Sequence, residues 1–319
     1  MAVNNPPIWI AVLAHNEEDI VAATLQSLAR QKLSDGKTIK LLVVANGCTD
    51  GTADRVRALQ ATLPNLELLS LLEKGKVNAI RAALDHFASE RAKGACGELV
   101  GLADADIQIP DDSILERMHA HLAKHPDLYL VSASPCARVS QRAASWAARG
   151  IIEARTFVNR IMGANLIRGQ LCLARLSRLQ QADIPATVVS DDMYWTHMLN
   201  GHFLMDHTCV VYTEGKTRLR AEIKRTTFLV AARHQLYAPG GCIRRRSLEP
   251  QTARPEWRGY RPRPRQIFSF LIHKRLWKSM VFLALWMPCN TYCELAGWLS
   301  HRRTRGRASD LHDMWNTSR

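Results

Sequence analysis

The sequence predicts an α/β fold built on a doubly wound, mostly parallel, Rossmann-like β-sheet. Short and nearly continuous apolar runs, typical of strands buried on both faces, occur at residues 8–13, 41–44, 66–71, 99–103 and 128–132. Stretches with apolar residues at helical spacing and a charged opposite face separate them, at residues 18–30, 52–63, 76–91 and 114–124. Because strands alternate with helices, each helix is expected to return the chain to a parallel neighbouring strand.

The alternation loosens after residue 140. The spacing predicts a helix over residues 143–160, a strand near 171–174 and a helix over 188–199. Two short strands, at residues 203–205 and 209–212, are expected to complete a mixed sheet. We place the end of this first domain near residue 238.

The charge of the chain is concentrated in its C-terminal third. The 319 residues carry a formal net charge of +14. Residues 215–319 contain 22 Lys and Arg against 6 Asp and Glu, or +16, which leaves −2 for residues 1–214. Such an asymmetry indicates a separate attachment function toward an anionic membrane surface, nucleic acid, or an acidic or diphosphate-bearing substrate, and composition does not choose between them.

Two further segments follow the first domain. Residues 239–266 are rich in Pro, Gly and Arg, which predicts an exposed loop or linker. Residues 267–319 form a basic, aromatic segment that we expect to be helical. Its apolar stretch from Met280 is interrupted by Pro288, so it is a poor transmembrane span. It is expected either to lie in the headgroup region of a membrane or to pack as a soluble helical hairpin.

The cysteines and the N-terminus indicate the compartment. Eight cysteines occur without a paired Cys-x-x-Cys motif, which is typical of reduced thiols. The first residues contain neither a charged leader nor an apolar signal segment. We therefore expect a cytoplasmic protein, with its basic end available for peripheral attachment to the inner face of the cytoplasmic membrane.

The pair Asp104 and Asp106 follows the apolar run 99–103 directly. Two carboxylates at the carboxyl end of a strand can hold a hard divalent cation, whose remaining positions are filled by a diphosphate. The alternative is a solvated turn or a helix cap, as Asp111 and Asp112 just downstream suggest. Ligands of doubly wound sheets bind beyond the carboxyl ends of the strands, where polar loops at His15, Asn46 and Glu73 are also expected.

Four motifs occur in an order that resembles the family 2 inverting glycosyltransferases, which have the GT-A fold and use nucleotide-diphosphate sugars. They comprise residues 8–18 (IWIAVLAHNEE), 46–52 (NGCTDGT), 74–78 (KGKVN) and 104–106 (DAD). The resemblance covers roughly residues 7–235. It implies a GT-A catalytic domain over residues 1–238.

The resemblance also implies the residues that bind the nucleotide, namely Asn16, Glu17, Asn46, Asp50, Lys76 and Asp104. Glu17 would accept hydrogen bonds from ribose hydroxyls, and Asn46 and Asp50 would lie near the base. The commoner family pattern has an Asp-Asp pair where this chain has Ala45 and Asn46, so the contact that reads the base departs from that pattern. An ordinary turn with a helix cap is the alternative for these loops.

The same resemblance implies the chemistry. Asp104 and Asp106 would be the metal residues, with Asp106 the main ligand of Mn²⁺ or Mg²⁺. The family has an acidic pair about ninety residues further on, where this chain has Asp191 and Asp192. Asp192 would be the general base and Asp191 would orient the acceptor or the metal, while helix capping is the alternative for both. His207 is a weaker candidate near the metal, and a histidine that is either exposed or satisfied by other hydrogen bonds is the favoured interpretation.

The predicted function is therefore the transfer of a sugar, with UDP-sugar as the first choice of donor, to a glycan or lipid-linked acceptor in cell-envelope or exopolysaccharide synthesis. The Gln/Arg-x-x-Arg-Trp motif of processive members is missing, which favours a single transfer. No nucleic-acid partner is expected. One alternative is a nucleotidyltransferase, although the loop after the first strand is not glycine-rich. The other is a non-catalytic protein that binds membrane or nucleic acid through its basic C-terminal region.

Overall fold

The computed structural model describes residues 6–138 and 166–214, together with 227–228, 231–232, 235–236 and 295. The chain divides into two compact units. The first comprises residues 1–136, 167–186 and 195–213, and the second comprises 137–166, 187–194 and 214–319. The predicted helix at 143–160 and the segments at 239–266 and 267–319 lie outside the described residues, apart from Leu295.

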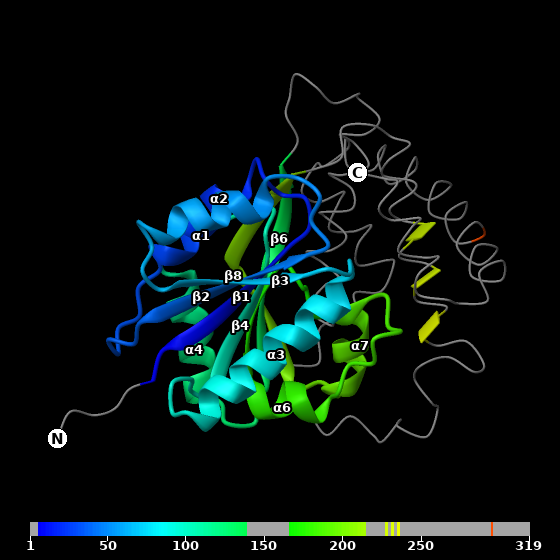
Figure 1. Cartoon of the computed structure of the whole chain (residues 1–319). Helices are drawn as coiled ribbons and strands as arrows, with labels where there is room; N and C mark the ends of the chain where they lie inside the picture. The colour runs from blue at the N-terminus through cyan, green and yellow to red at the C-terminus, as the bar shows by residue number, and fades with distance from the viewer. Residues whose placement is uncertain are drawn as a thin grey trace, which may run out of the picture. The chain divides into compact units, whose positions relative to one another are not determined.

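An eight-stranded mixed sheet organises the described residues (Figure 1). Its parallel half has the order β3-β2-β1-β4, formed by β1 (Ile8–Ala14), β2 (Ile39–Asn46), β3 (Leu66–Leu71) and β4 (Leu99–Asp104). Residues Leu13 and Asp104 are register partners at the ends of β1 and β4. Ala14 and Ala45 pair near the ends of β1 and β2, so β2, β1 and β4 end close together at one edge of the sheet.

The remaining strands extend the sheet beyond β4 in the order β7-β6-β8-β5. They are β5 (Ile107–Gln108), β6 (Leu130–Arg138), β7 (Leu171–Arg175) and β8 (Phe203–Glu214). Strand β7 is antiparallel to both β4 and β6, and β5 is antiparallel to β8. The predicted fold class is confirmed, with the parallel strands in the N-terminal half and the antiparallel pairs after it.

Helices connect and cover these strands: α1 (Val21–Ala29), α2 (Thr52–Gln60), α3 (Lys76–Ala92), α4 (Ile114–Lys124), α6 (Leu176–Gln181) and α7 (Asp191–Met198). In Figure 1, α1 and α2 lie together on one face of the parallel strands, and α3 and α6 lie on the other. Every residue of β1 is buried between these layers. No helix among the described residues is long and apolar enough to cross a membrane.

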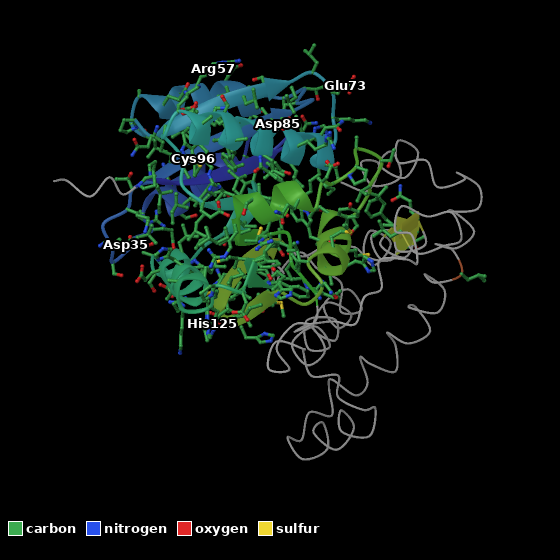
Figure 2. All side chains as sticks on the ribbon, turned by 90° about the horizontal axis from the view of Figure 1, so that it is seen from below. Asp35, Arg57, Glu73, Asp85, Cys96 and His125 are labelled. Atoms are coloured by element: carbon green, nitrogen blue, oxygen red, sulfur yellow. The ribbon has the colours of Figure 1, made fainter. Side chains whose placement is uncertain are left out.

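The two ends of the parallel strands differ in character. Trp9, near the start of β1, is fully buried and donates its indole N–H to the carbonyl of Ala95 at 2.9 Å. Figure 2 shows Glu73, which follows β3, beyond the carboxyl ends of the strands, and Cys96, which precedes β4, toward their opposite ends. A buried tryptophan thus lies near the amino end of β1, whereas polar loops follow the carboxyl ends.

Strand β8 corrects one prediction. The two short strands expected at residues 203–205 and 209–212 form one continuous strand from Phe203 to Glu214. Asp206 does not interrupt it, because the carboxylate is 8% exposed and accepts hydrogen bonds from the backbone N–H and hydroxyl of Thr208, both at 2.8 Å. A polar residue whose hydrogen bonds are satisfied locally can remain inside a strand.

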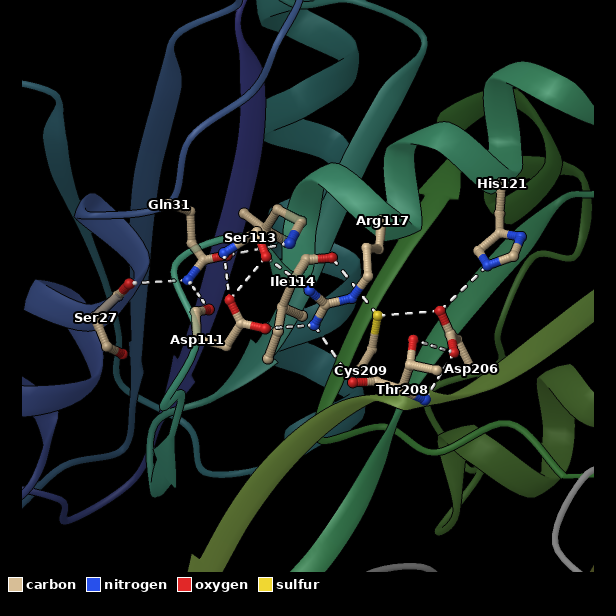
Figure 3. Close-up of polar contacts among 11 residues, drawn as sticks. Ser27, Gln31, Asp111, Ser113, Ile114, Arg117, His121, Asp206, Thr208 and Cys209 are labelled. Atoms are coloured by element: carbon tan, nitrogen blue, oxygen red, sulfur yellow. Dashed lines mark hydrogen bonds and ion pairs between the residues drawn. The ribbon is translucent and has the colours of Figure 1, made fainter.

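A partly buried polar network joins β8 to α4 (Figure 3). The Asp206 carboxylate lies 3.2 Å from His121 Nε2 and 3.2 Å from the Cys209 thiol. Burial and, to a smaller extent, the charge of the neighbouring Asp206 raise the pKa of Cys209 to about 12. The thiol therefore stays protonated and can donate a hydrogen bond. Arg117 of α4 pairs with Asp111 at 2.7 Å and donates to the Thr208 carbonyl at 3.3 Å. These contacts anchor the strand that pairs with β5.

Candidate active site

The loops after β1 and β2 are joined to one another by hydrogen bonds. Thr49 donates its backbone N–H to Asn16 Oδ1 at 2.8 Å, and Glu17 donates its own N–H to the Thr52 hydroxyl at 2.8 Å. In the next pair, the Gly51 N–H donates to the Glu18 carboxylate at 3.0 Å. Because side chains of each loop bind the backbone of the other, Asn16 and Glu17 are held in place before any ligand arrives. The sequence predicted no role for Glu18, although this residue ends the motif at residues 8–18.

Asp50 has a structural role in this junction. Its carboxylate accepts the N–H of Thr52 at 3.0 Å and the N–H of Glu18 at 3.2 Å. Burial alone would raise the pKa of Asp50, but hydrogen bonds from the Thr52 hydroxyl and from these backbone groups lower it below its ordinary value. The carboxylate is therefore stably ionised at the edge of the sheet, at the start of α2.

Asn46, the last residue of β2, links three segments. Its side chain is buried, with the residue 4% exposed. The amide nitrogen donates to the Ala14 carbonyl at 2.7 Å, and the amide oxygen accepts the Gly75 N–H at 3.0 Å. Its backbone carbonyl lies 2.7 Å from His15 Nδ1. The Asn46 side chain is thus directed to the backbone of the loops that surround it, and neighbouring Ala45 is a buried apolar residue.

Two glycines permit the loops to approach this closely. Gly47 has φ +57°, and a Cβ there would lie 2.7 Å from the backbone nitrogen of Lys74. Gly75 has φ +147° and precedes the first residue of α3. Residues other than glycine are strained in these backbone conformations, because they carry a Cβ atom. The loop after β3 therefore lies directly against the loop after β2, and Asn78 packs against Gly75.

Lys76 and Asp104 form an ion pair at the centre of this edge. The ammonium nitrogen of Lys76 lies 2.8 Å from Asp104 Oδ1. Lys76 is the first residue of α3, and Asp104 is the last residue of β4. Both side chains remain partly exposed, by 32% and 20%, so the pair is accessible to a solute. The sequence predicted both residues as nucleotide ligands, and the structure brings them together.

Asp106 is the second carboxylate of the acidic motif. It is half-buried, and none of the described residues donates a hydrogen bond to its carboxylate. A carboxylate without an internal partner suits a hard divalent cation, which prefers oxygen ligands. The described residues contain no group of three or more His, Cys, Asp or Glu that could hold a metal ion by itself. Asp104 and Asp106 offer carboxylate oxygens, which are of the kind that Mn²⁺ or Mg²⁺ binds.

Asp191 and Asp192 lie in the second unit, at the start of α7. Asp191 is 6% exposed, whereas Asp192 is half-buried. Asp192 Oδ1 accepts the Ser190 hydroxyl and the Met193 N–H, the latter at 2.8 Å. Its side chain thus contacts the first turn of the helix, in which Asp192 is the second residue. His207 is exposed on β8 in the first unit.

The fold with its acidic motif at the carboxyl edge of a mixed sheet is that of the GT-A glycosyltransferases. The sequence model described as Glycosyl transferase family 2 matches residues 9–167. The chain belongs to this family and is a glycosyltransferase. No curated protein sequence matches it.

Solved structures are similar to this chain at low sequence identity. The mannosyltransferase PcManGT from Pyrobaculum calidifontis, in complex with GDP-Man and Mn²⁺, superposes with a TM-score of 0.57 at 20% identity, covering 98% of this chain and 87% of that one. Glucosyl-3-phosphoglycerate synthase from Mycobacterium tuberculosis, with Mg²⁺ and UDP, gives 0.48 at 17% identity over 72% and 78%. TarS from S. aureus gives 0.47 at 18% identity over 73% of this chain and 40% of that one.

Proposed function

We propose that the protein is a metal-dependent inverting glycosyltransferase that moves a sugar from a nucleotide-diphosphate sugar to a glycan or lipid-linked acceptor in cell-envelope or exopolysaccharide synthesis. The observation that carries the proposal is the arrangement of Lys76, Asp104 and Asp106 at the carboxyl edge of the sheet. The arrangement combines the ammonium group of Lys76 with the carboxylate of Asp104 that pairs with it. It also includes the carboxylate of Asp106, which has no partner among the described residues. This set suits the binding of a diphosphate together with a divalent cation.

The joined loops after β1 and β2 are the proposed nucleoside site. Asn16 and Glu17 are fixed there by Thr49 and Thr52. The carboxylate of Glu17 matches the vicinal hydroxyls of a ribose, which are hydrogen-bond donors. The buried side chain of Asn46 supports this site by holding the neighbouring loops, and we place it near the base.

Lys76 is the proposed diphosphate contact. Its ammonium group, already at the edge of the sheet beside Asp104, can donate hydrogen bonds to a phosphate oxygen. Asp106, with Asp104, would hold Mn²⁺ or Mg²⁺. When bound, the cation supplies positive charge that stabilises the leaving nucleoside diphosphate.

Asp192 is the proposed general base, with Asp191 positioning the acceptor. Its carboxylate would take the proton of the acceptor hydroxyl as the hydroxyl oxygen attacks the anomeric carbon. Attack opposite to the leaving diphosphate inverts the configuration of that carbon. The hydrogen bonds from Ser190 and Met193 fix the orientation of the carboxylate at the helix N-terminus.

A thermal-shift panel tests the donor class, because a ligand that binds only the folded state raises its apparent stability. The panel contains UDP-, GDP- and TDP-sugars with and without Mn²⁺, and Asp106→Asn is the control. We expect a Mn²⁺-dependent shift with one nucleotide, with UDP as the first choice, that disappears in the control. The GDP-sugar is included because GDP-Man is bound in the PcManGT complex. The absence of any shift would contradict the proposal and favour a non-catalytic binding protein.

We also propose that the basic C-terminal region attaches a cytoplasmic catalytic domain, residues 1–238, to the inner face of the membrane. The net charge of +16 over residues 215–319 supports this proposal. Co-sedimentation of the full chain with anionic vesicles, compared with zwitterionic vesicles at low and high salt, tests it. Binding that requires anionic lipid and weakens with salt is expected. Equal recovery with both kinds of vesicle would contradict it.

A further inference from the structure

We propose that Thr24 is a positioning residue that holds the acidic motif in the geometry that its metal ion requires. This inference rests on the proposed function, because it assigns a role toward the cation at Asp106. Thr24 lies on α1 and is fully buried, so it touches neither solvent nor substrate. It acts on Asp106 through the backbone.

The hydroxyl of Thr24 lies between two carbonyl groups on either side of Asp106. Its oxygen is 2.7 Å from the Ala105 carbonyl and 2.8 Å from the Ile107 carbonyl. A hydroxyl has one proton, which these two acceptors share. Both residues that flank Asp106 in sequence are therefore attached to the same side-chain atom, and the chain between them is held as a closed turn.

The rest of the turn is fixed on its other sides. The N–H of Ala105 donates to the Leu13 carbonyl at 3.2 Å, and the N–H of Asp104 donates to the Gln170 carbonyl at 2.9 Å. Ile107 is in register with Thr213 of β8, the strand anchored by the network of Figure 3. Among the described residues, the Thr24 side chain donates to both carbonyls that flank Asp106.

Removal of the hydroxyl leaves two buried carbonyls with one fewer donor. The turn can then relax to recover hydrogen bonds, and the direction of the Asp106 side chain changes with it. Groups that orient metal ligands without touching the metal affect affinity strongly, typically by ~10- to 100-fold. The position on α1 also matters, because this helix follows the loop that carries Asn16 and Glu17.

The experiment measures Mn²⁺ affinity by electron paramagnetic resonance of the full chain, with UDP in one series and GDP in another. Thr24→Val removes the hydroxyl and keeps the shape of the side chain, and Thr24→Ser keeps the hydroxyl. Ser27→Ala is the matched control, because it deletes a buried hydroxyl on the same helix. Among the described residues this hydroxyl donates to the Thr24 carbonyl, at 2.8 Å. Thr24→Ala is a second hydroxyl deletion in case Thr24→Val does not fold.

We expect Thr24→Val to weaken Mn²⁺ binding by at least ~10-fold, and Thr24→Ser and Ser27→Ala to stay within about twofold of wild type. Hydrogen exchange in peptides that cover residues 99–112 should rise in Thr24→Val but not in Ser27→Ala. If wild type binds Mn²⁺ and the hydroxyl deletions bind it equally well, the role of Thr24 is overturned while the proposed function stands. If wild type binds no Mn²⁺ with either nucleotide, the metal assignment fails, and this inference fails with it.

Discussion

The ammonium nitrogen of Lys76 lies 2.8 Å from Asp104 Oδ1, which joins the first residue of α3 to the last residue of β4. One carboxylate of the acidic motif is thus paired with a cation of the protein itself. The other, Asp106, has no such partner among the described residues. This difference distinguishes two residues that look equivalent in sequence.

Substitution of Lys76 tests both its proposed contact with the diphosphate and its pairing with Asp104. Lys76→Met removes the proposed phosphate contact, so the affinity for UDP or GDP with Mn²⁺ should fall by about tenfold, or about 1.4 kcal/mol. The same change frees Asp104, so the affinity for Mn²⁺ alone should rise. Isothermal titration calorimetry measures both. Lys93→Met is the control, because Lys93 pairs with Glu90 at the opposite end of α3. A decrease in both affinities would contradict the assignment.

Substitutions of Asp106 and Asp192 should have different effects on donor binding and on sugar transfer. Asp106→Asn is expected to abolish metal-dependent donor binding, because the amide is a poor substitute for a carboxylate ligand. Asp192→Asn should retain donor binding and lose transfer, because only this residue is assigned to proton removal. Donor binding is measured by thermal shift, and transfer by release of nucleoside diphosphate. Equal loss of donor binding in both variants would show that the roles are wrongly assigned.

The stability of the protein should depend on the hydrogen bond that the Asn46 amide donates to the Ala14 carbonyl. In Asn46→Asp, a carboxylate oxygen replaces the nitrogen that donates to the Ala14 carbonyl, and the free energy of unfolding at pH 7 should fall by about 2–3 kcal/mol. Burial beside an acceptor raises the pKa of the new carboxyl above its ordinary value of about 4, so the folded state binds the proton more tightly.

The loss in Asn46→Asp should therefore shrink as pH falls from 7 toward 5, since the protonated carboxyl can donate to Ala14 again. Urea denaturation of the variant and of wild type at both pH values measures the difference. A loss that does not change with pH would contradict the proposed geometry.

The close approach at Gly47 predicts a position-specific cost. Gly47→Ala places a Cβ 2.7 Å from the Lys74 nitrogen in a backbone with φ +57°, whereas Gly36→Ala has a similar φ of +73° and open space around it. In the control, Gly36→Ala, the free energy of unfolding should fall by about 1 kcal/mol from backbone strain alone. In Gly47→Ala it should fall by about 1–3 kcal/mol more. Equal losses in denaturant unfolding would show that the loops can separate without cost.

The network around Asp206 predicts acid sensitivity. Burial would raise the pKa of Asp206, but hydrogen bonds from Thr208 and Cys209 and the charge of His121 lower it below its ordinary value of 3.8. A lowered pKa in the folded state contributes stability that is complete above 3.8 and is lost as pH falls through the folded value.

Asp206→Asn should lower the free energy of unfolding by about 2 kcal/mol at pH 7 and flatten its decline below pH ~4. Asp54→Asn, at an aspartate whose side chain is 82% exposed, is the control and should change stability by less than ~0.5 kcal/mol. Urea unfolding between pH 3 and 7 measures both. An unchanged acid dependence in Asp206→Asn would contradict the role of this carboxylate.

The parallel half of the sheet could be read from the sequence because its signals are local. The helix predicted over residues 114–124 is α4 with the same bounds, and the run at 8–13 is β1 with one further residue. Strand β5 has only two residues and gives no periodic signal. Strand β8 was predicted as two pieces because the hydrogen bonds that satisfy Asp206 are not visible in hydropathy.

The position of the candidate site residues at one edge of the sheet could be predicted from the sequence, but the contacts between them could not. Family motifs place Asn16, Asn46, Lys76 and Asp104 at one edge, yet they do not show that Lys76 pairs with Asp104 or that the Asn46 amide is directed to backbone. Such contacts join segments that are far apart in the chain and depend on loop conformation. The roles of Asp191 and Asp192 and the boundary near residue 238 remain predictions.

The hydrogen bonds between the loops after β1 and β2 have a thermodynamic consequence for donor selection. Loops that are already ordered lose little conformational entropy when a ligand arrives, so more of the interaction free energy appears as affinity. An ordered surface also adapts poorly to a base of the wrong shape. Discrimination between nucleotides should therefore appear mainly in how fast the wrong donor dissociates, with similar association rates for all of them.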